Sequence, residues 1–405
     1  MISVNEALAF ILNHTKEGPG TVVSTEEALG LVLAEDVRAL NDIPPFTNSA
    51  MDGYAVRSSD TRGASRKRPL TLKLLETVPA GRMPTKRVSA GWATKIMTGA
   101  PMPRGADAVL VAEDSDEKNG SILCFAVVRR GENVRRAGED ARRGERVLPK
   151  GTRIRPQEMG MLGAIGRTRV RVIRRPRVAI LATGSELVEA DRTPGPGQIR
   201  NCNNLSLIGL VKKYGAEPVN LGLVRDDARA LRGRIIAGAS CDLVVTSGGV
   251  SVGEQDLVKK TLARLGAGVK FWQVRVKPGK PLAFGLVRGT PVFGLPGNPV
   301  SVIVSFEQFV RPALLKMMGR KKLKKPVITA ILQNSIEKPA GRIHLIRARI
   351  RRRGGKYHAS PLGPQGSGML TSMVMADGLI IVPARKTAVR AGETVRVMMP
   401  DWSEE

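Results

Sequence analysis

Between residues 241 and 301 the chain alternates short apolar runs with polar loops that are rich in glycine and proline. The apolar runs cover residues 243–245, 282–284 and 292–295. They are too short for helices and are bounded by turn residues, so we predict three buried parallel strands. In an open α/β sheet, ligands bind where the strands deliver their carboxyl-end loops. The pattern therefore places a candidate site in these loops.

The loops contain small, polar and charged residues in a mixture that favours a polyanionic ligand held together with a metal. Glycine lets the backbone approach closely, hydroxyl and backbone N–H groups bind phosphate, and carboxylates bind a divalent cation. The candidates are Ser247, Gly248, Gly249, Ser251, Glu254 and Asp256, then Gly297, Asn298 and Ser301, with Lys277 and Lys280 from the segment between them.

Alternation of strands and helices extends this region from residue 176 to residue 325. RVAILATG is predicted to be a buried strand that ends in the loop containing Glu186. PVNLGLVRDD is predicted to be a second strand, with Asp226 and Asp227 at its carboxyl end. Asp226 is also a candidate cap for the helix that follows, so its part in a site stays open at this point.

Two further helices are predicted around the candidate site. The first should begin at a cap formed by Asn203 or Asn204. The second should cover residues 300–318, with Asn298 as its cap and Pro299 at the first helical position. The partial positive charge of its N-terminus would then point toward the cleft at the strand ends.

The rest of the chain has a different pattern, and 405 residues are too many for one core. Short strands interrupted by Gly and Pro predict a β-rich inserted domain over residues 45–140 and a small β-barrel over residues 326–405. Residues 1–44 and 141–175 are predicted to form one discontinuous, elongated α+β domain, and residues 176–325 the α/β domain. The expected fold class is α/β plus β, in an elongated multidomain chain.

Polar loops outside the α/β region provide further candidates. Asp52 follows Pro44-Pro45. One interpretation of this segment is a hinge between domains, and the other is a rigid polar loop that faces a cleft. Thr98 lies in a turn, Asp140 follows a pair of arginines, and Ser367 lies between two glycines. An ordinary solvated or flexible loop is the alternative interpretation of each.

Composition limits the classes of function. The formal net charge is +29, but the basic residues are spread along the chain and aromatic residues make up only 3%, so we do not expect nucleic acid as the main ligand. No apolar run approaches the roughly 20 residues of a membrane span, and the N-terminus reads as an amphipathic helix rather than a signal. Three widely spaced cysteines indicate neither a disulfide framework nor a zinc site, so we expect a reducing cytoplasm.

The residue inventory also limits the chemistry. The chain has only three histidines, none of them in the glycine-rich loops, and it lacks a GxxxxGK[ST] motif. A Ser-His-Asp or Cys-His set and a P-loop are therefore excluded. Metal-assisted and electrostatic chemistry remains, with acids holding a divalent cation and lysines and arginines holding anions.

Seven motifs in one order resemble a known family. They are PPFTNSAMDGYAV, IMTGAPMPRGADAVL, GENVRRAGED, ILATGSEL, VTSGGVSVGEQD, KPGKPLAFG and GLPGNPVS. Together they resemble the molybdopterin molybdenumtransferases, or MoeA family, which include the catalytic C-terminal part of gephyrin. The resemblance covers nearly the whole chain.

The resemblance implies that adenylylated molybdopterin and molybdate are bound, that AMP is released, and that Mg²⁺ is required. It implies a homodimer whose site is shared between subunits, with the upstream adenylyltransferase as a further candidate partner. The catalytic residues that it implies are Asp52, Thr98, Asp140, Glu186, Asp226, Asp256, Lys277 and Lys280, of which Glu186, Asp226 and Asp256 would hold the metal. As binding residues it implies Pro296, Pro299, Ser301, Arg342 and Ser367, which join Ser247, Gly248, Gly249, Ser251, Gly297 and Asn298 from the pattern of the strand-end loops.

Within the binding set, Arg342, Ser367 and Ser301 would form an oxyanion site together with Lys277 and Lys280. Gln273 and Pro364 stand where relatives often have lysine and histidine. Four alternatives stay open: a molybdopterin adenylyltransferase, tungsten insertion by the same chemistry, a scaffold that has kept the fold but not the reaction, and a nucleic-acid binder. The first 175 residues and the last barrel argue against the adenylyltransferase.

Overall fold

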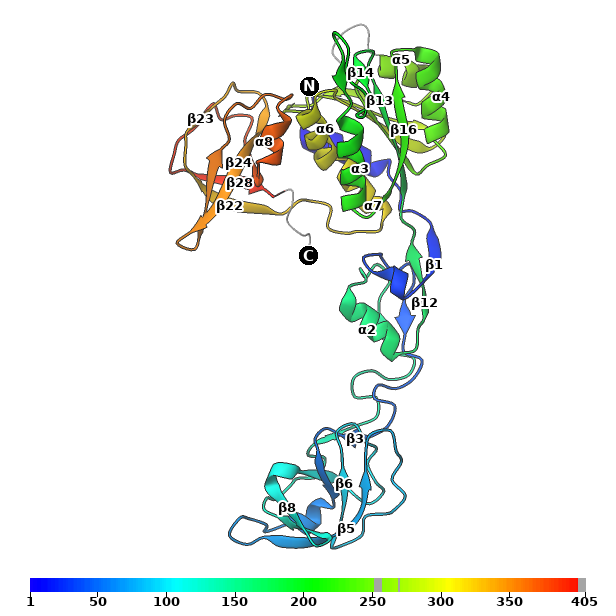
Figure 1. Cartoon of the computed structure of the whole chain (residues 1–405), viewed down its shortest axis with the longest axis vertical. Helices are drawn as coiled ribbons and strands as arrows, with labels where there is room; N and C mark the ends of the chain where they lie inside the picture. The colour runs from blue at the N-terminus through cyan, green and yellow to red at the C-terminus, as the bar shows by residue number, and fades with distance from the viewer. Residues whose placement is uncertain (251–256, 269, 400–405) are drawn as a thin grey trace. The chain divides into compact units, whose positions relative to one another are not determined.

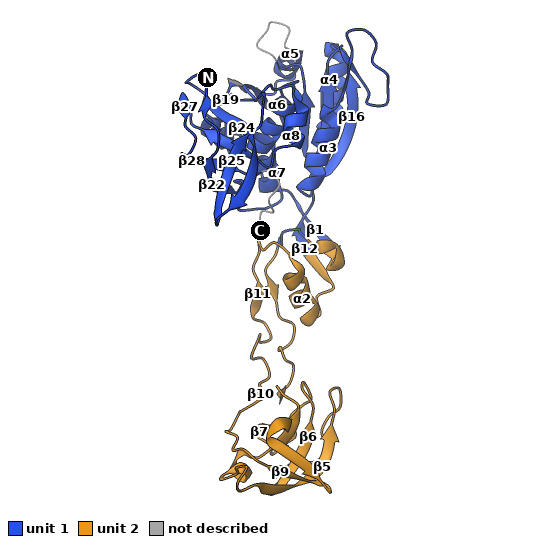
Figure 2. Ribbon diagram, turned by 60° about the vertical axis from the view of Figure 1, so that its left-hand side comes forward, with its two compact units in different colours: residues 1–22, 30–34, 171–405 blue, residues 23–29, 35–170 orange. Residues whose placement is uncertain are grey.

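The computed structural model describes residues 1–250, 257–268 and 270–399. The chain forms two compact units, which Figure 2 shows in blue and orange. Unit 1 contains residues 1–22, 30–34 and 171–405, and unit 2 contains residues 23–29 and 35–170. In the part of the chain that is described, no helix has both the length and the apolar character needed to cross a bilayer.

Unit 1 contains a six-stranded sheet in the order β16-β13-β17-β21-β20-β18. The four strands from β16 to β21 are parallel, as the sequence predicts for β17 and β21. The bounds are β16 (Glu217–Val224), β13 (Arg177–Thr183), β17 (Leu243–Ser247), β21 (Thr290–Leu295), β20 (Pro281–Val287) and β18 (Lys270–Gln273).

The prediction that residues 282–284 form a parallel strand is wrong, because β20 runs antiparallel to β21. Only Arg288 and Gly289 connect the two strands, and both have positive φ angles of 53° and 84°. A two-residue turn with these angles makes a hairpin, whereas a parallel pair needs a long crossover. The reversal places the start of β20, and with it Lys277 and Lys280, at the edge where the parallel strands end.

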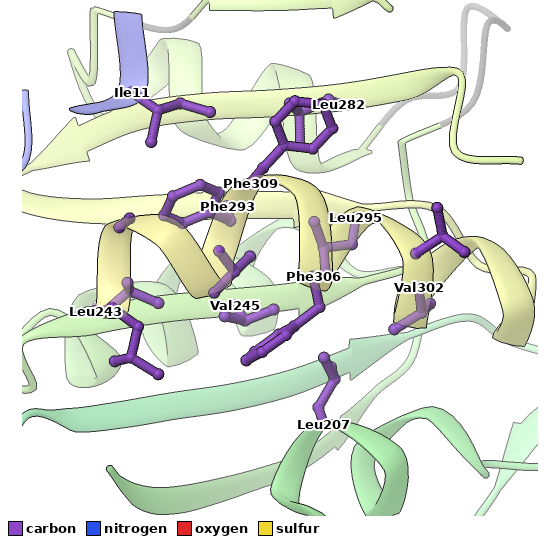
Figure 3. Close-up of a cluster of buried hydrophobic side chains, with 14 of the residues drawn as sticks. Ile11, Leu207, Leu243, Val245, Leu282, Phe293, Leu295, Val302, Phe306 and Phe309 are labelled. Carbon is purple, nitrogen blue, oxygen red and sulfur yellow. The ribbon is translucent and has the colours of Figure 1, made fainter. Parts of the chain in front are cut away.

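Helices cover both faces of this sheet (Figure 1). Alternate residues of the strands face opposite sides of the sheet. On one side, Val178 and Val245 belong to a core with α1, α3 and the α6–α7 segment. On the other side, Ala179 and Val244 belong to a core with α4 and α5. Figure 3 shows the first core, in which Leu243, Phe293 and Phe306 lie close together. The bounds are α1 (Val4–Asn13), α3 (Asn203–Lys213), α4 (Ala228–Gly238), α5 (Leu257–Arg264), α6 (Pro299–Ser305) and α7 (Arg311–Met317).

The predicted start of the first helix is wrong, whereas the second helix begins where it was predicted, after Asn298 at the N-cap position. Cys202 occupies the N-cap of α3, and the Asn201 side chain accepts the hydrogen bond from the Asn204 backbone N–H (3.3 Å), so neither Asn203 nor Asn204 is the cap. Asn298 does precede α6, with Pro299 in the first turn, but its side chain makes no capping hydrogen bond. The predicted helix over residues 300–318 is also interrupted by a π-helical segment, η4 (Phe306–Val310).

The C-terminal part of unit 1 is a closed five-stranded barrel in the order β24-β25-β22-β28-β26, which closes because β24 also pairs with β26. This confirms the predicted small barrel. A further strand, β19, pairs in parallel with β24 and lies directly before the loop with Lys280. The bounds are β19 (Val276–Lys277), β22 (Val327–Leu332), β24 (Ile343–Arg353), β25 (Lys356–Pro361), α8 (Leu370–Val374), β26 (Gly378–Val382) and β28 (Thr394–Met398), with a separate pair of β23 (Ile336–Glu337) and β27 (Ala388–Val389).

Barrel and sheet share one core, since Leu345 and Leu379 of the barrel belong to the same buried cluster as Leu243 of the sheet. Ile11 of α1 belongs to this cluster as well. The first helix therefore packs within unit 1. The division of the chain into four domains remains a prediction.

Unit 2 contains a mixed six-stranded sheet in the order β7-β4-β6-β5-β9-β8, in agreement with the β-rich pattern of residues 45–140. Its strands are β4 (Gly53–Val56), β5 (Leu70–Val78), β6 (Trp92–Ile96), β7 (Ala108–Val111), β8 (Ser115–Lys118) and β9 (Ser121–Cys124). The unit also contains the helix α2 (Pro156–Ala164) and the short pairs of β3 (Asn48–Ser49) with β10 (Val134–Arg135) and β2 (Val37–Arg38) with β11 (Arg146–Leu148).

Candidate functional site

The strand ends of unit 1 open into one cleft with a volume of about 1410 Å³. It contains most of the residues that the sequence predicts. Those that line it are Glu186, Asp226, Ser247, Gly248, Gly249, Lys277, Lys280, Pro296, Gly297, Asn298, Pro299, Ser301, Arg342 and Ser367. Ser251, Glu254 and Asp256 lie outside the described residues. Asp52, Thr98 and Asp140 belong to unit 2.

The loop after β17 lines the cleft with backbone. Gly248 has a φ angle of +88°, and a Cβ atom there would lie 2.2 Å from the carbonyl oxygen of Thr183, so only glycine fits. The neighbouring Ser247 is 1% exposed, and its hydroxyl has no hydrogen-bond partner among the described residues. This loop therefore leaves room for a ligand to approach the backbone.

A tight loop holds the two lysines. The backbone N–H of Val274 donates to the carbonyl of Lys280 (2.8 Å), which closes the loop at its base. Gly279, with a φ angle of +98°, lies against α6, where a Cβ atom would come within 2.7 Å of the Ser305 hydroxyl. The lysine loop is thus fixed to the helix that begins at the cleft.

The Ser367 loop reaches from the barrel to the α/β part of the cleft. The Asn298 amide donates to the Ser367 hydroxyl (2.8 Å), and the backbone N–H of Val300 donates to the Ser367 carbonyl (3.1 Å). Arg347, which is 1% exposed, donates to the carbonyl of Gly366 (3.0 Å) from within the barrel. Two parts of unit 1 therefore meet at Ser367.

Acidic residues lie at the other end of the cleft. Asp226 accepts hydrogen bonds from the Thr183 hydroxyl (3.2 Å) and from the backbone N–H and hydroxyl of Ser185 (both 3.1 Å). Asp227, rather than Asp226, caps α4 by accepting from the Arg229 N–H (2.8 Å). This settles the alternative for Asp226: its carboxylate faces the cleft and is not a helix cap.

No metal centre is preformed in the part of the chain that is described. Within residues 1–250, 257–268 and 270–399, no three His, Cys, Asp or Glu residues are grouped closely enough to hold an ion. Of the three predicted metal ligands, Glu186 and Asp226 line the cleft and Asp256 lies outside the described residues.

Most charges are divided between two parts of the cleft, except that Arg200 lines it on the side of Glu186, whose carbonyl accepts from the N–H of Ile199 (2.8 Å). Glu186 and Asp226 follow β13 and β16, at one side of the sheet, while Lys277 and Lys280 precede β20, beyond β17 and β21. Arg342 of the barrel lines the cleft as well. A ligand that fills the cleft therefore meets carboxylates along one part of its length and cations along another.

Sequence reasoning missed several lining residues. Asn203 was considered only as a cap, whereas its amide donates to the carbonyl of Gly297 (2.7 Å) and fixes the loop after β21. Lys260 of α5 adds another cation, and Gln365 supports the Ser367 loop by accepting from the backbone N–H of Arg347 (2.9 Å). Arg347 also supports this loop. Because β24 contains several arginines, nothing in the sequence distinguishes Arg347 from the others.

In unit 2, two of the three predicted residues contact each other. The Asp52 carboxylate accepts hydrogen bonds from the Thr98 backbone N–H (2.7 Å) and hydroxyl (2.8 Å). The backbone bond, followed by the hydroxyl bond, lowers the pKa of Asp52 below its ordinary value. Asp140 is exposed, and its backbone N–H donates to the carbonyl of Ile43 (3.0 Å). Their roles stay predictions.

Three families match consecutive parts of the chain. Residues 2–166 match the "MoeA N-terminal region (domain I and II)", residues 179–316 the "Probable molybdopterin binding domain", and residues 329–399 the "MoeA C-terminal region (domain IV)".

Similar proteins cover nearly the whole length. The "Molybdopterin molybdenumtransferase 2" of Mycobacterium tuberculosis is 37% identical over 98% of this chain and 99% of its own length. The "Molybdopterin molybdenumtransferase" of Haemophilus influenzae is 37% identical over 93% of this chain and 92% of its own. The structure of the molybdopterin biosynthesis MoeA protein from Pyrococcus horikoshii OT3 has a TM-score of 0.84 and 34% identity, and it covers 98% of this chain and 100% of its own. The chain therefore belongs to the molybdopterin molybdenumtransferase (MoeA) family.

Proposed function

We propose that this chain is a molybdopterin molybdenumtransferase of molybdenum cofactor biosynthesis, which transfers molybdenum from molybdate to adenylylated molybdopterin and releases AMP in a Mg²⁺-dependent reaction. The observation that carries the proposal is that one cleft presents two carboxylates, Glu186 and Asp226, in one part and the lysines Lys277 and Lys280 in another. Such a cleft can hold a phosphate with its cation and a separate metal oxyanion at the same time.

The cationic end is the proposed oxyanion site. Lys277, Lys280 and Arg342 supply positive charge, and the hydroxyls of Ser301 and Ser367 supply donors. Hydrogen bonds from charged donors to an oxyanion are stronger than neutral ones, and a partly enclosed cleft weakens them less than bulk water does. Tungstate meets the same donors, so tungsten insertion remains an alternative outcome of the same chemistry.

The acidic end is suited to Mg²⁺. This ion is usually bound through one or two carboxylates plus substrate phosphates, and the exposed carboxylates of Glu186 and Asp226 provide that number. A Cβ atom on Gly184 would lie 2.6 Å from the Glu186 carboxylate, so this glycine leaves room for it. Asp256 is the third proposed ligand. Bound there, Mg²⁺ would neutralise charge on the adenylate phosphates.

The residues of the chain then bind and orient the substrates. The Gly249 N–H in the loop after β17 binds a phosphate oxygen, since the Gly248 N–H already donates to the carbonyl of Leu295 (3.1 Å), and the α6 N-terminus adds its partial positive charge. Lys277 and Lys280 hold the oxyanion beside the dithiolene sulfurs, so that both reactants are kept at one place. The chain contributes positioning and electrostatic stabilisation and forms no covalent bond.

A homodimer would complete the site with Asp52, Thr98 and Asp140 from the second copy. Exposed apolar side chains support such an interface: Phe46 and Met51 near Asp52, and Val374 and Met375 on α8 next to the Ser367 loop. We further propose that the reaction takes place in the cytoplasm, where the three free cysteines stay reduced, and that the upstream adenylyltransferase delivers the substrate.

AMP release tests the proposal. The purified chain is incubated with adenylylated molybdopterin, Mg²⁺ and molybdate, and with tungstate in a parallel reaction. We expect AMP release that needs the oxyanion, stops with a chelator and is lost in Lys277→Ala. The matched control is Lys270→Ala, since Lys270 does not line the cleft. Equal AMP release by wild type and Lys277→Ala would contradict the proposed site. Synthesis of adenylylated molybdopterin from ATP would favour the adenylyltransferase alternative.

A further inference from the structure

Two neighbouring asparagines begin α3, and their side-chain amides contact different loops of the sheet. Asn203 is 6% exposed and Asn204 is 4% exposed, so both side chains are buried. Successive residues of a helix project about 100° apart, so the two amides point in different directions. Neither residue is the helix cap, because Cys202 occupies that position. Buried amides need hydrogen-bond partners, and here the partners show what the two asparagines hold in place.

The strand β16 contains a β-bulge shortly before its carboxyl end. Asn220 pairs with Ile180 of β13. The next pair along the strands is Leu223 with Ala182, so two residues of β16 lie opposite one residue of β13. Gly222 lies within the bulge and has a φ angle of +78°, which favours glycine. Bulges next to active sites commonly change the direction of the residues that follow them.

Asn204 fixes this bulge from the helix. Its amide donates to the side-chain oxygen of Asn220 (3.2 Å) and to the carbonyl of Gly222 (3.1 Å). The same oxygen of Asn220 accepts from the backbone N–H of Gly222 (2.9 Å), so the three residues form one network. Asp226, which lines the acidic end of the cleft, comes four residues after Gly222. The network therefore lies directly before a carboxylate of the site.

Asn203 holds a loop at the other side of the sheet. Its amide donates to the carbonyl of Gly297 over 2.7 Å. The next residue, Asn298, bonds to Ser367 and precedes the first turn of α6. In the sheet, β13 and β17 separate β16 from β21, so at a spacing of about 4.8 Å these two strands lie roughly 14 Å apart. One helical turn therefore contacts loops that belong to both parts of the cleft.

We propose that Asn203 and Asn204 are positioning residues that set the distance between the two ends of the cleft. Asn204 places the carboxylate of Asp226 for Mg²⁺, and Asn203 places the wall that binds the oxyanion. The helix is a rigid support for both, since Leu207 and Val211 are fully buried against the sheet. Two bound reactants must be held at the correct separation, and a displacement of about 1 Å can cost on the order of 100-fold in rate. The inference rests on the proposed function, which assigns the two ends their ligands.

Ion binding reports on each bond separately and needs no turnover. Mn²⁺ replaces Mg²⁺ and is followed by electron paramagnetic resonance with AMP present, and radioactive molybdate is followed by equilibrium dialysis. We expect Asn204→Ala to raise the Kd for Mn²⁺ roughly 2- to 10-fold and to leave the Kd for molybdate unchanged. Asn203→Ala should do the reverse. The concentrations of the two ions that give half the maximal rate of AMP release should show the same crossed pattern.

Matched variants separate a positioning role from a merely structural one. Asn203→Leu and Asn204→Leu keep nearly the size of the side chain without its donor, so each should resemble the corresponding alanine variant. Leu207→Val disturbs the packing of α3 and keeps both amides, so urea should unfold it earlier while both dissociation constants stay unchanged. Dissociation constants that shift together in an asparagine variant, or that shift in Leu207→Val, would overturn the inference, because the asparagines would then only stabilise the helix.

The binding and turnover measurements distinguish this inference from the proposed function. Crossed binding effects in a chain whose wild type releases no AMP would refute the proposed reaction and leave the positioning of both ions standing. AMP release by the wild type, with unchanged ion binding in Asn203→Ala and Asn204→Ala, would refute the positioning role and leave the reaction standing. A wild type that binds neither ion would overturn both.

Discussion

The side-chain amide of Asn298 donates a hydrogen bond to the hydroxyl of Ser367 over 2.8 Å. The two residues come from the α/β part and the barrel part of unit 1. This bond therefore joins the two walls of the cleft at the proposed oxyanion site. Asn298 occupies the N-cap position of α6 without a capping bond from its own side chain, and the N–H of Val300 donates to the Ser367 carbonyl instead (3.1 Å).

Asn298→Ala should weaken oxyanion binding without unfolding the protein. A hydrogen bond of this kind contributes about 0.5–1.5 kcal/mol, so we expect the KM for molybdate to rise roughly 2- to 10-fold. Steady-state AMP release at varied molybdate checks this. In a double-mutant cycle with Ser367→Ala, the two effects should not add, because each substitution removes the same contact. Full additivity would mean that the bond has no part in oxyanion binding.

Gly248→Ala should disrupt the loop after β17. The new Cβ atom would lie 2.2 Å from the Thr183 carbonyl oxygen at a φ angle of +88°, and such strain costs on the order of 1–3 kcal/mol. Gly297→Ala is the matched control, because a Cβ atom there meets its nearest neighbour, Gly248 Cα, at 3.7 Å. Urea unfolding should show a clear loss for the first variant and little for the second. Equal loss in both would show that the close approach to Thr183 is not the cause.

Lys325→Met should destabilise unit 1 strongly. Lys325 lies 3.1 Å from Glu307, which is 4% exposed, and burial raises the pKa of Glu307 despite the neighbouring lysine. Removing one partner of a buried ion pair typically costs about 3–5 kcal/mol. The double variant Lys325→Met/Glu307→Met should regain only part of this loss, because it also removes the carboxylate that lies 3.9 Å from the buried Arg311. Lys95→Met breaks an exposed pair with Glu117 and should cost less than about 1 kcal/mol.

Acid should weaken the fold through His344. Its pKa is about 4 in the native state, below the ordinary 6.5, because of burial and the charges of Lys338, Lys277 and Arg342. Between these values the unfolded chain binds a proton at this histidine and the native chain does not, so stability falls as the pH decreases from 6.5 toward 4. Urea unfolding at pH 7 and pH 5 measures the loss, which should be smaller in His344→Leu. An equal loss in both proteins would remove His344 as the cause.

The sequence predicted those elements of the fold that depend only on the pattern of neighbouring residues. Buried apolar runs marked β17 and β21, and the glycines after β17 lie where a close approach requires them. The direction of β20 was predicted wrongly, as parallel, because Arg288-Gly289 is a weak hairpin signal beside a run that suits a parallel strand equally well. The direction matters, since it brings the lysine loop to the strand ends.

The missed site residues depend on contacts between distant segments. Asn203 reads as a helix cap from its neighbours, yet it bonds to Gly297, which lies 94 positions further along the chain. Arg347 and His344 lie in a strand whose alternation says only which face they occupy. Their importance comes from the loops packed around them, and no local pattern in one sequence reports that packing.

The hairpin between β20 and β21 has a consequence for engineering and for natural variation. Its turn lies at the far end of a seven-residue strand, roughly 23 Å from the lysine loop. An insertion of one residue in that turn would slide β20 along its neighbour and exchange its two faces. Leu282 would then leave its core, and the two lysines would be carried away from the ends of the parallel strands, although nothing near them had been altered. The position of both lysines in the cleft therefore depends on the length of a turn that does not itself line the cleft.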